Sequence, residues 1–234
     1  MGKQVKLLGI SASPRKGSNS MILLTKALDS AAKVSGVVTE VLDLHKKSYK
    51  HCIGCSACNR RREKCILKGD DFEEFFEKWV SADGIIISTP IYHMSVPSNL
   101  KAALDRLGNS VISMYPEEPR RLIKVGGAIT QGMNRFGGQE FAMQFIINSF
   151  LLMDCIPVAG DMPISYIGAG GSTYGDPKAG AISSNENAIL SAENIGQRVA
   201  ELSKIIVTGK EHLRDELPKE YYLDIQKHFI SKEE

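Results

Sequence analysis

The sequence lacks any apolar run near the ~18 residues that a membrane-spanning helix requires. It also lacks an N-terminal secretory signal, because residues 1–6 are polar and lead straight into a short apolar stretch. Lys6 stands where a myristoylation motif beginning at Gly2 needs Ser or Thr. These absences predict a cytoplasmic protein with no membrane partner.

The chain has little net charge, with 29 Lys and Arg residues against 27 Asp and Glu residues, which gives +2. This balance argues against a nucleic-acid partner. Hydrophobic residues make up 43% and charged residues 24% of the 234 positions, which excludes a disordered or fibrous chain. The length fits one large domain or two small ones.

The charge is nevertheless uneven along the chain. Residues 45–68 contain eight Lys or Arg residues and a single acidic residue, Glu63. The same segment holds four of the five cysteines. In a cytosolic protein, clustered cysteines indicate metal or redox chemistry rather than disulfides.

Apolar patterning alternates between predicted strands and predicted helices, which indicates an α/β protein with a doubly wound parallel sheet. Strands are predicted at residues 5–11, 37–44, 84–88, 122–129 and 156–159, and helices at 21–33, 70–80, 98–107, 138–153 and 187–207. The Gly-, Ser- and Pro-rich residues 160–185 are predicted to form a long loop. We expect one domain over residues 1–210, with a cysteine insertion at 45–69, and a tail at 211–234 that docks on a neighbouring subunit.

Ligands of such sheets bind beyond the carboxyl ends of the strands, so the loops there are the informative ones. The first loop, residues 11–20, carries neither a dinucleotide fingerprint nor a nucleotide P-loop. It is rich in hydroxyls and ends at a helix N-terminus, where backbone N–H groups favour a phosphomonoester. An ordinary helix cap is the alternative, although it needs only one Ser or Asn. The candidate phosphate ligands are Ser11, Ser13, Arg15, Ser18, Asn19 and Ser20.

The loops after the third and fourth strands can support a flat aromatic ligand with backbone amides, although each could also be a plain connection. His93 is either a general acid or a solvated bystander, and Gln139 and Glu140 could simply cap the following helix. The candidates in the two loops are Thr89, Pro90, Ile91, Tyr92 and His93, and Thr130, Gln131 and Gly132.

These loops resemble those of the NADPH-dependent FMN reductase family of flavodoxin-like proteins. Residues 13–20 resemble its phosphate loop, and residues 89–92, followed by Leu100-Lys101 and Leu104-Asp105-Arg106, look like its isoalloxazine loop and the next helix. The resemblance implies a three-layer α/β/α fold with a five-stranded sheet in the order 2-1-3-4-5. It also implies FMN, with its phosphate on the first loop, and homodimers or homotetramers with flavin near the subunit interfaces.

Four cysteines, Cys52, Cys55, Cys58 and Cys65, follow a compact C-x2-C-x2-C-x6-C pattern. The pattern resembles the ferredoxin spacing for a [4Fe-4S] cluster, except that its last gap is longer, and it is similar to the iron–sulfur flavoprotein branch of the family. Free or redox-active thiols are one alternative, and zinc is another, although zinc sites usually separate their ligand pairs more widely. Cys155 stands alone and reads as a small buried hydrophobe.

The sequence therefore predicts an FMN-dependent electron-transfer oxidoreductase with a [4Fe-4S] cluster and no nucleophilic side chain. A ferredoxin-like protein would donate electrons, and a quinone or an oxygen species would accept them. The alternatives are a cluster-free NAD(P)H-dependent FMN or quinone reductase and a flavin-binding or zinc-bearing redox sensor.

Overall fold

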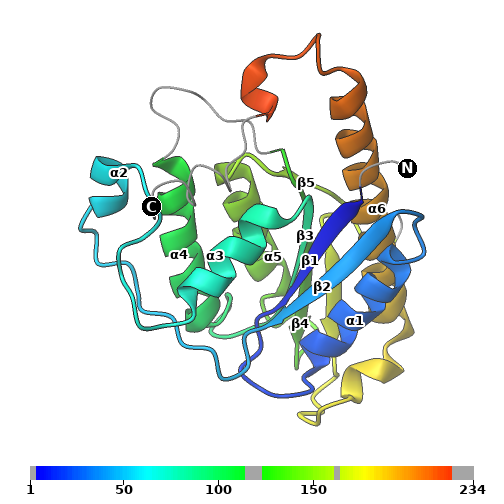
Figure 1. The fold of residues 1–234 in the computed structure, drawn as a ribbon. Helices are drawn as coiled ribbons and strands as arrows, with labels where there is room; N and C mark the ends of the chain where they lie inside the picture. Colours follow the sequence, from blue (N-terminus) through cyan, green and yellow to red (C-terminus); the bar gives the residue numbers. More distant parts are fainter. Residues whose placement is uncertain (1–3, 114–122, 161–163, 223–234) are drawn as a thin grey trace.

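A parallel β-sheet forms the centre of the computed structural model, which describes residues 4–113, 123–160 and 164–222. Its strands lie in the order β2-β1-β3-β4-β5 (Figure 1), which confirms the predicted order and fold class. Within the described ranges, no helix is long and apolar enough to cross a membrane. The strands are β1 (Val5–Ser11), β2 (Val37–Asp43), β3 (Gly84–Pro90), β4 (Val125–Gly132) and β5 (Ile156–Pro157).

A sixth strand, β6 (Ala169–Ser172), was not expected from the sequence, which predicted a loop there. β5 pairs with the start of β4, at Val125 and Gly126, and β6 pairs with its end, from Ile129 to Gly132. The two short strands therefore lie one after the other along the same edge of β4, with a break between them. A 3-10 helix, η1 (Ala181–Ser184), also lies within the predicted loop.

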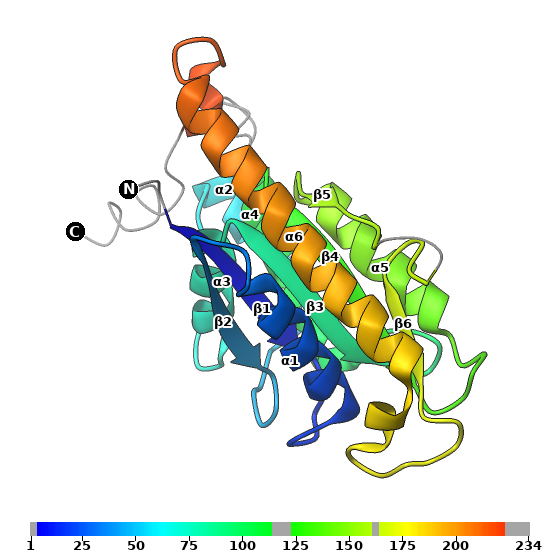
Figure 2. The same ribbon diagram turned by 90° about the vertical axis from the view of Figure 1, so that its right-hand side faces the viewer.

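Helices cover both faces of the sheet and give three layers (Figures 1 and 2). One face carries α1 (Asn19–Ala31) and α6 (Glu186–His212), and the other carries α3 (Phe72–Ser81), α4 (Ser98–Ile112) and α5 (Gln139–Leu152).

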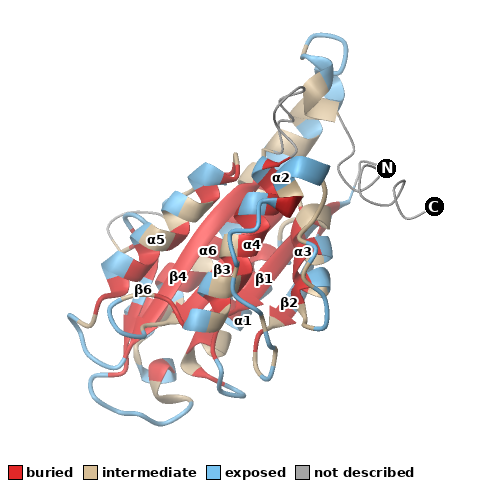
Figure 3. Ribbon diagram, turned by 90° about the vertical axis from the view of Figure 1, so that its left-hand side faces the viewer, coloured by how far each residue is buried: buried red, intermediate tan, exposed pale blue. Residues whose placement is uncertain are grey.

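Successive side chains of a strand point to opposite faces, so the sheet contributes to two separate cores. Leu7 and Ile86 belong to the core under α1 and α6, whereas Leu8 and Ile85 belong to the core under α3, α4 and α5. The central strands are consequently buried along most of their length (Figure 3). This explains why they read as continuous apolar runs in the sequence.

α6 extends beyond the sheet and carries the start of the predicted tail (Figure 2). The hydroxyl of Tyr222, in the short helix η2 (Lys219–Tyr222), donates to the carbonyl oxygens of Lys210 (2.9 Å) and Leu213 (3.1 Å). This part of the tail therefore packs on the end of α6 of its own chain. The rest of the predicted tail, residues 223–234, and the first residue of the strand predicted at 122–129 lie outside the described residues.

Candidate functional site

The first loop joins β1 to α1, and its hydroxyls are partly used to shape it. The Oγ atom of Ser18 accepts a hydrogen bond from the Met21 amide (3.2 Å), so Ser18 is the N-cap of α1. Ser13 Oγ accepts from the Arg15 amide (3.1 Å), which sets the turn before the helix. The Arg15 side chain is exposed to solvent in the loop before α1. The cap predicted as an alternative is thus present, but it accounts for Ser18 alone.

Asn19 has a second function that the sequence did not reveal. Its Nδ2 donates to the Lys178 carbonyl (3.1 Å), and its Oδ1 accepts from the amides of Gly180 (2.8 Å) and Ile182 (3.4 Å). The side chain therefore ties the first loop to η1, about 160 residues later in the chain. Both acceptor positions of Oδ1 are thus occupied, and only the backbone and the second N–H of Nδ2 are left to meet a ligand.

Three buried hydroxyls at the carboxyl edge of the sheet have no hydrogen-bond partner among the described residues. They are Ser11 Oγ at the end of β1, Ser20 Oγ in the first turn of α1, and Thr130 Oγ1 near the end of β4. Buried hydroxyls are normally paired, so these unpaired ones fit an edge that receives a polar ligand. Ser88 differs, because its hydroxyl donates to the Ser20 carbonyl (2.7 Å).

The loop after β3 closes on itself in a strained turn. The backbones of Tyr92 and Ser95 exchange two hydrogen bonds (2.8 and 2.9 Å). His93 and Met94, which lie between these two residues, have φ angles of 47° and 63°. Two successive left-handed residues of this kind are usually Asn and Gly. Tyr92 is 43% exposed. Strain of this kind is typical of functional loops.

We expect Met94→Gly to raise the free energy of unfolding by about 0.5–1 kcal/mol, as measured by urea denaturation. Glycine relieves a left-handed strain of roughly 1–2 kcal/mol and costs roughly 0.5–1 kcal/mol in backbone entropy. Met94→Ala is the matched control, because it removes the side chain but keeps the Cβ atom. Equal stability of the two variants would show that the turn stores no strain.

The loop after β4 is braced against the turn after β3. A Cβ atom added to Gly138, whose φ is 101°, would lie 2.9 Å from Met94 Cα, so only glycine allows this approach. Gln139 holds the loop through its side chain, with Nε2 donating to the Asn134 carbonyl (2.6 Å) and Oε1 accepting from the Gly137 amide (2.8 Å). Gln139 is therefore more than the helix cap that the sequence suggested.

The remaining candidates in these two loops are mostly turned inward. Thr89 Oγ1 donates to the Pro90 carbonyl (3.0 Å), and Gln131 Nε2 donates to the Gly132 carbonyl (2.7 Å). The Ile91 amide donates to the Gln131 carbonyl (2.9 Å), which joins the loops after β3 and β4. The structure therefore brings both sets of predicted residues together at one edge of the sheet.

A hollow of about 480 Å³ opens beside these loops, between the start of α5 and the segment around β6. Its walls include the exposed aromatic side chains of Phe136, Phe141, Tyr166 and Tyr174, and Phe136 is 96% exposed. Sequence reasoning missed Tyr166 and Tyr174, because residues 160–185 showed no periodic pattern that could place them beside α5.

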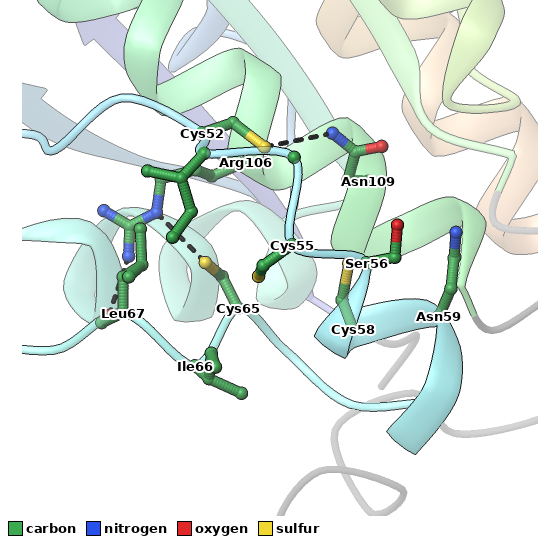
Figure 4. A pocket seen from close by; sticks show the side chains of 12 residues that line it. Cys52, Cys55, Ser56, Cys58, Asn59, Cys65, Ile66, Leu67, Arg106 and Asn109 are labelled. Carbon is green, nitrogen blue, oxygen red and sulfur yellow. Dashed lines mark hydrogen bonds between the residues drawn. The ribbon is translucent and has the colours of Figure 1, made fainter.

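The four clustered cysteines line a single pocket of about 60 Å³ (Figure 4). They lie around a tight turn and the short helix α2 (Ala57–Arg61), where Gly54, Ser56 and Arg62 all have positive φ. α4 supplies the opposite wall through Arg106 and Asn109. The structure therefore brings the four thiols to one pocket, and their role as metal ligands stays a prediction. Across residues 4–113, 123–160 and 164–222, no three His, Cys, Asp or Glu side chains are placed to hold one metal ion.

Two of the pocket thiols accept hydrogen bonds from α4. Asn109 Nδ2 lies 3.6 Å from Cys52 Sγ, and Arg106 Nε lies 3.3 Å from Cys65 Sγ. Burial raises the pKa of the Cys58 thiol, and the neighbouring Cys65 and Cys52 add to this effect.

Cys155 is separate from the pocket thiols. It is buried at the end of α5, and burial raises its pKa to about 12. A buried thiol that stays protonated is unreactive, so the prediction that Cys155 is a small hydrophobe is confirmed.

The basic surface around the pocket is partly neutralised by α3. Lys47 pairs with Asp71 (3.3 Å) and Glu74, while Lys64 and Lys68 both pair with Glu73. The excess of positive charge in the sequence is therefore smaller in the fold. Such exposed pairs contribute little to stability, at most about 1 kcal/mol each.

Known proteins resemble the chain over most of its length. The family model for NADPH-dependent FMN reductase matches residues 5–166. An iron–sulfur flavoprotein of Methanocaldococcus jannaschii is 36% identical over 204 residues, which cover 86% of this chain and 99% of that protein. An iron–sulfur flavoprotein of Methanosarcina thermophila is 38% identical over 142 residues, which cover 61% and 71% of the two chains.

Among solved structures, a WrbA-like flavodoxin from Agrobacterium tumefaciens matches with a TM-score of 0.56 and 15% identity, covering 86% of this chain and 99% of that one. At this identity the likeness concerns the fold alone. The family match, the full-length relative and the flavodoxin-like sheet agree. The chain therefore belongs to the NADPH-dependent FMN reductase family, in the branch of the iron–sulfur flavoproteins, and is an FMN-dependent oxidoreductase.

Proposed function

We propose that this protein transfers electrons from a ferredoxin-like donor, through a [4Fe-4S] cluster held by Cys52, Cys55, Cys58 and Cys65, to FMN and on to a small-molecule acceptor. One observation carries the proposal, namely that four cysteines of an FMN reductase chain line one pocket. When bound, the cluster supplies one-electron transfer, and FMN supplies one- and two-electron chemistry. The relatives named above are themselves called iron–sulfur flavoproteins.

We assign FMN to the carboxyl edge of the sheet in a single domain, residues 1–210, that carries the cysteine insertion at 45–69. The phosphate would bind at the N-terminus of α1, where the first-turn amides are not used within the helix. Arg15 would supply positive charge, and the unpaired hydroxyls of Ser11 and Ser20 would supply donors. The turn at Tyr92 and the β4–α5 loop would hold the flavin ring.

The pocket geometry favours a cluster over a single zinc ion. Four thiolates around one ion at ~2.3 Å must lie about 3.8 Å from one another, and no such group occurs among the described residues. In a cubane each thiolate binds a different iron atom, so the thiols must surround a wider space. Four cysteines spread around one pocket fit that requirement better.

The two proposed sites lie apart within one chain. α4 begins at Ser98, just after the loop that would hold the flavin, and reaches the cysteine pocket only at Arg106 and Asn109. At ~1.5 Å per residue, this is about 12–17 Å along the helix. We therefore propose that the active form is a homodimer or homotetramer in which a neighbour brings one cluster close to another subunit's FMN.

Deletion of residues 217–234 tests whether the tail holds this assembly. If the tail grips a neighbour, light scattering will show a smaller particle, and the rate of cluster reduction during FMN photoreduction will fall. The described part of the tail packs on α6 of its own chain through Tyr222, so its removal alone favours an unchanged particle size. A wild type that is monomeric at micromolar concentration with full activity would contradict the assembly proposal altogether.

The acceptor would reach the flavin through the aromatic hollow beside the β4–α5 loop. Its volume of about 480 Å³ suits a molecule of the size of a quinone, and its aromatic walls suit a flat ring. A small oxygen species would need no such hollow. A quinone is therefore the acceptor that the geometry favours.

A cluster-free NAD(P)H-dependent FMN or quinone reductase is the second candidate. The family match favours it, because the matching model is that of NADPH-dependent FMN reductases. In that case hydride would pass directly to FMN, and the thiols would be free or act in redox sensing.

Composition of the protein purified without oxygen separates the candidates. The lead proposal predicts about four iron and four sulfide ions per chain, a broad absorption shoulder beside the flavin bands, and no zinc. Flavin bands alone would support the cluster-free reductase, and stoichiometric zinc would support the sensor. Either result would overturn the lead proposal.

A further inference from the structure

Arg106 is a buried cation whose donors are all directed toward the cysteine loop. The residue is 1% exposed. Its Nε donates to Cys65 Sγ (3.3 Å), and its Nη2 donates to the Leu67 carbonyl (2.8 Å). Its Nη1 donates to the Asp70 carboxylate and lies 3.4 Å from the Lys50 carbonyl. One guanidinium thus contacts four residues of the same segment.

These contacts join the two ends of the cysteine loop. Lys50 precedes the first cysteine by two residues, whereas Leu67 and Asp70 follow the last one. Asp70 Oδ2 also accepts from the Lys50 amide (2.8 Å), which closes the loop a second time. The Arg106 Cζ atom lies over the Phe72 ring, 4.0 Å from its centre. The clamp is therefore fixed from several sides.

The charge of Arg106 is balanced at the same place. The Asp70 side chain is 3% exposed and pairs with Arg106. Burial alone would raise the pKa of Asp70, but hydrogen bonds from the Lys50 amide and Arg106 outweigh it and hold the pKa below its usual value. The pair is ionised and nearly neutral overall. Arg106 therefore acts on the Cys65 sulfur through a directed N–H donor, because Asp70 balances its positive charge.

We propose that Arg106 is a positioning residue for the cysteine pocket, which closes the loop from Lys50 to Asp70 and donates a hydrogen bond to the Cys65 sulfur. This inference rests on the proposed cluster function. A hydrogen bond to a ligating sulfur stabilises the extra negative charge of the reduced cluster, so it raises the reduction potential. The closed loop holds Cys65 in place before any cluster is inserted.

Arg106→Lys is the decisive variant, because it keeps the positive charge but removes the planar fork and the Nε donor. In loaded protein, a dithionite-mediated titration followed by EPR is expected to show a more negative potential. A tenfold change in the reduced-to-oxidised ratio corresponds to about 59 mV for one electron. Asp70→Asn should shift the potential in the opposite direction, because it leaves the Arg106 charge unbalanced. Lys101→Gln, on the exposed face of the same helix, is the control and should cause no shift.

A second readout needs no cluster. In apoprotein, the rate of iodoacetamide alkylation at Cys65 is followed by peptide mass spectrometry at about pH 9.5, above the usual range of thiol titration, so that the rate reports access to the sulfur. It should rise at least several-fold in Arg106→Lys and not in Lys101→Gln. Wild-type protein without iron would defeat the proposed function, and the alkylation rates would still decide whether the clamp exists. If wild type carries iron but Arg106→Lys changes neither the potential nor the alkylation rate, the positioning role of Arg106 is wrong.

Discussion

Cys55→Ala protein purified without oxygen is expected to contain no iron and no acid-labile sulfide while it keeps a full complement of FMN. Cys55 is the most exposed of the four pocket cysteines and lies in the turn before α2, outside the strands, so its loss should not unfold the domain. With only three thiolates left, one iron atom of a cubane has no protein ligand, so the cluster is not expected to survive purification. Metal analysis and FMN release measure the two cofactors separately.

Cys155→Ala is the matched control for this experiment. It removes a thiol of the same type from a buried position at the end of α5, away from the pocket. Iron and FMN should both match the wild type, although the lost packing should lower stability modestly. If Cys55→Ala retains its iron, or if Cys155→Ala loses it, the assignment of the four ligands is wrong.

The largest expected effect on flavin comes from the double variant Arg15→Ala, Ser18→Ala. Arg15 would pair directly with the phosphate, and a charged hydrogen bond of this kind contributes roughly 1.5–3 kcal/mol. Its loss alone should weaken FMN by about 10- to 150-fold, and the loss of Ser18 should weaken it further. Fluorescence titration of apoprotein with FMN measures the affinity.

Ser18 also caps α1, so its removal costs about 1 kcal/mol of stability without any ligand. Unfolding of the apoprotein must therefore be measured beside FMN binding. Lys26→Ala removes a positive charge from an exposed site later in the same helix and should leave the affinity unchanged. An unchanged affinity in the double variant would remove the phosphate from this loop.

Sequence patterns located the first three strands closely. The strand predicted at residues 5–11 coincides with β1, the one at 37–44 exceeds β2 by one residue, and the run at 84–88 lies within β3. The strand predicted at 122–129 is displaced, because β4 spans Val125–Gly132 and its last residues are polar or glycine. β6 was missed because its sequence, Ala-Gly-Gly-Ser, carries no apolar pattern. The backbone at Gly171 packs closely on Ile182, where an added Cβ would lie 2.9 Å from its Cδ1 atom. That requirement is set by tertiary contacts and not by local propensity.

In the candidate site, too, local spacing was predictable from the sequence and tertiary contacts were not. Cysteine spacing alone predicts the shared pocket, because two successive C-x-x-C steps confine three thiols to one turn and the fourth follows closely in the sequence. The partners of those thiols on α4 could not be foreseen, since 41 residues separate Arg106 from Cys65. Family resemblance had placed Arg106 in the helix after the flavin loop. The structure confirms the helix but shows that this side chain faces the cysteines.

The three hydrogen bonds of Asn19 couple residues 178–182 to the first loop, so a change in the loop can be measured at these residues. The amide protons of Gly180 and Ile182 end on Asn19 Oδ1, so their exchange with deuterium requires the link between α1 and η1 to open. Any ligand that immobilises the N-terminus of α1 should therefore slow exchange at these two amides. Residues 178–182 would then gain protection from proteases without touching the ligand.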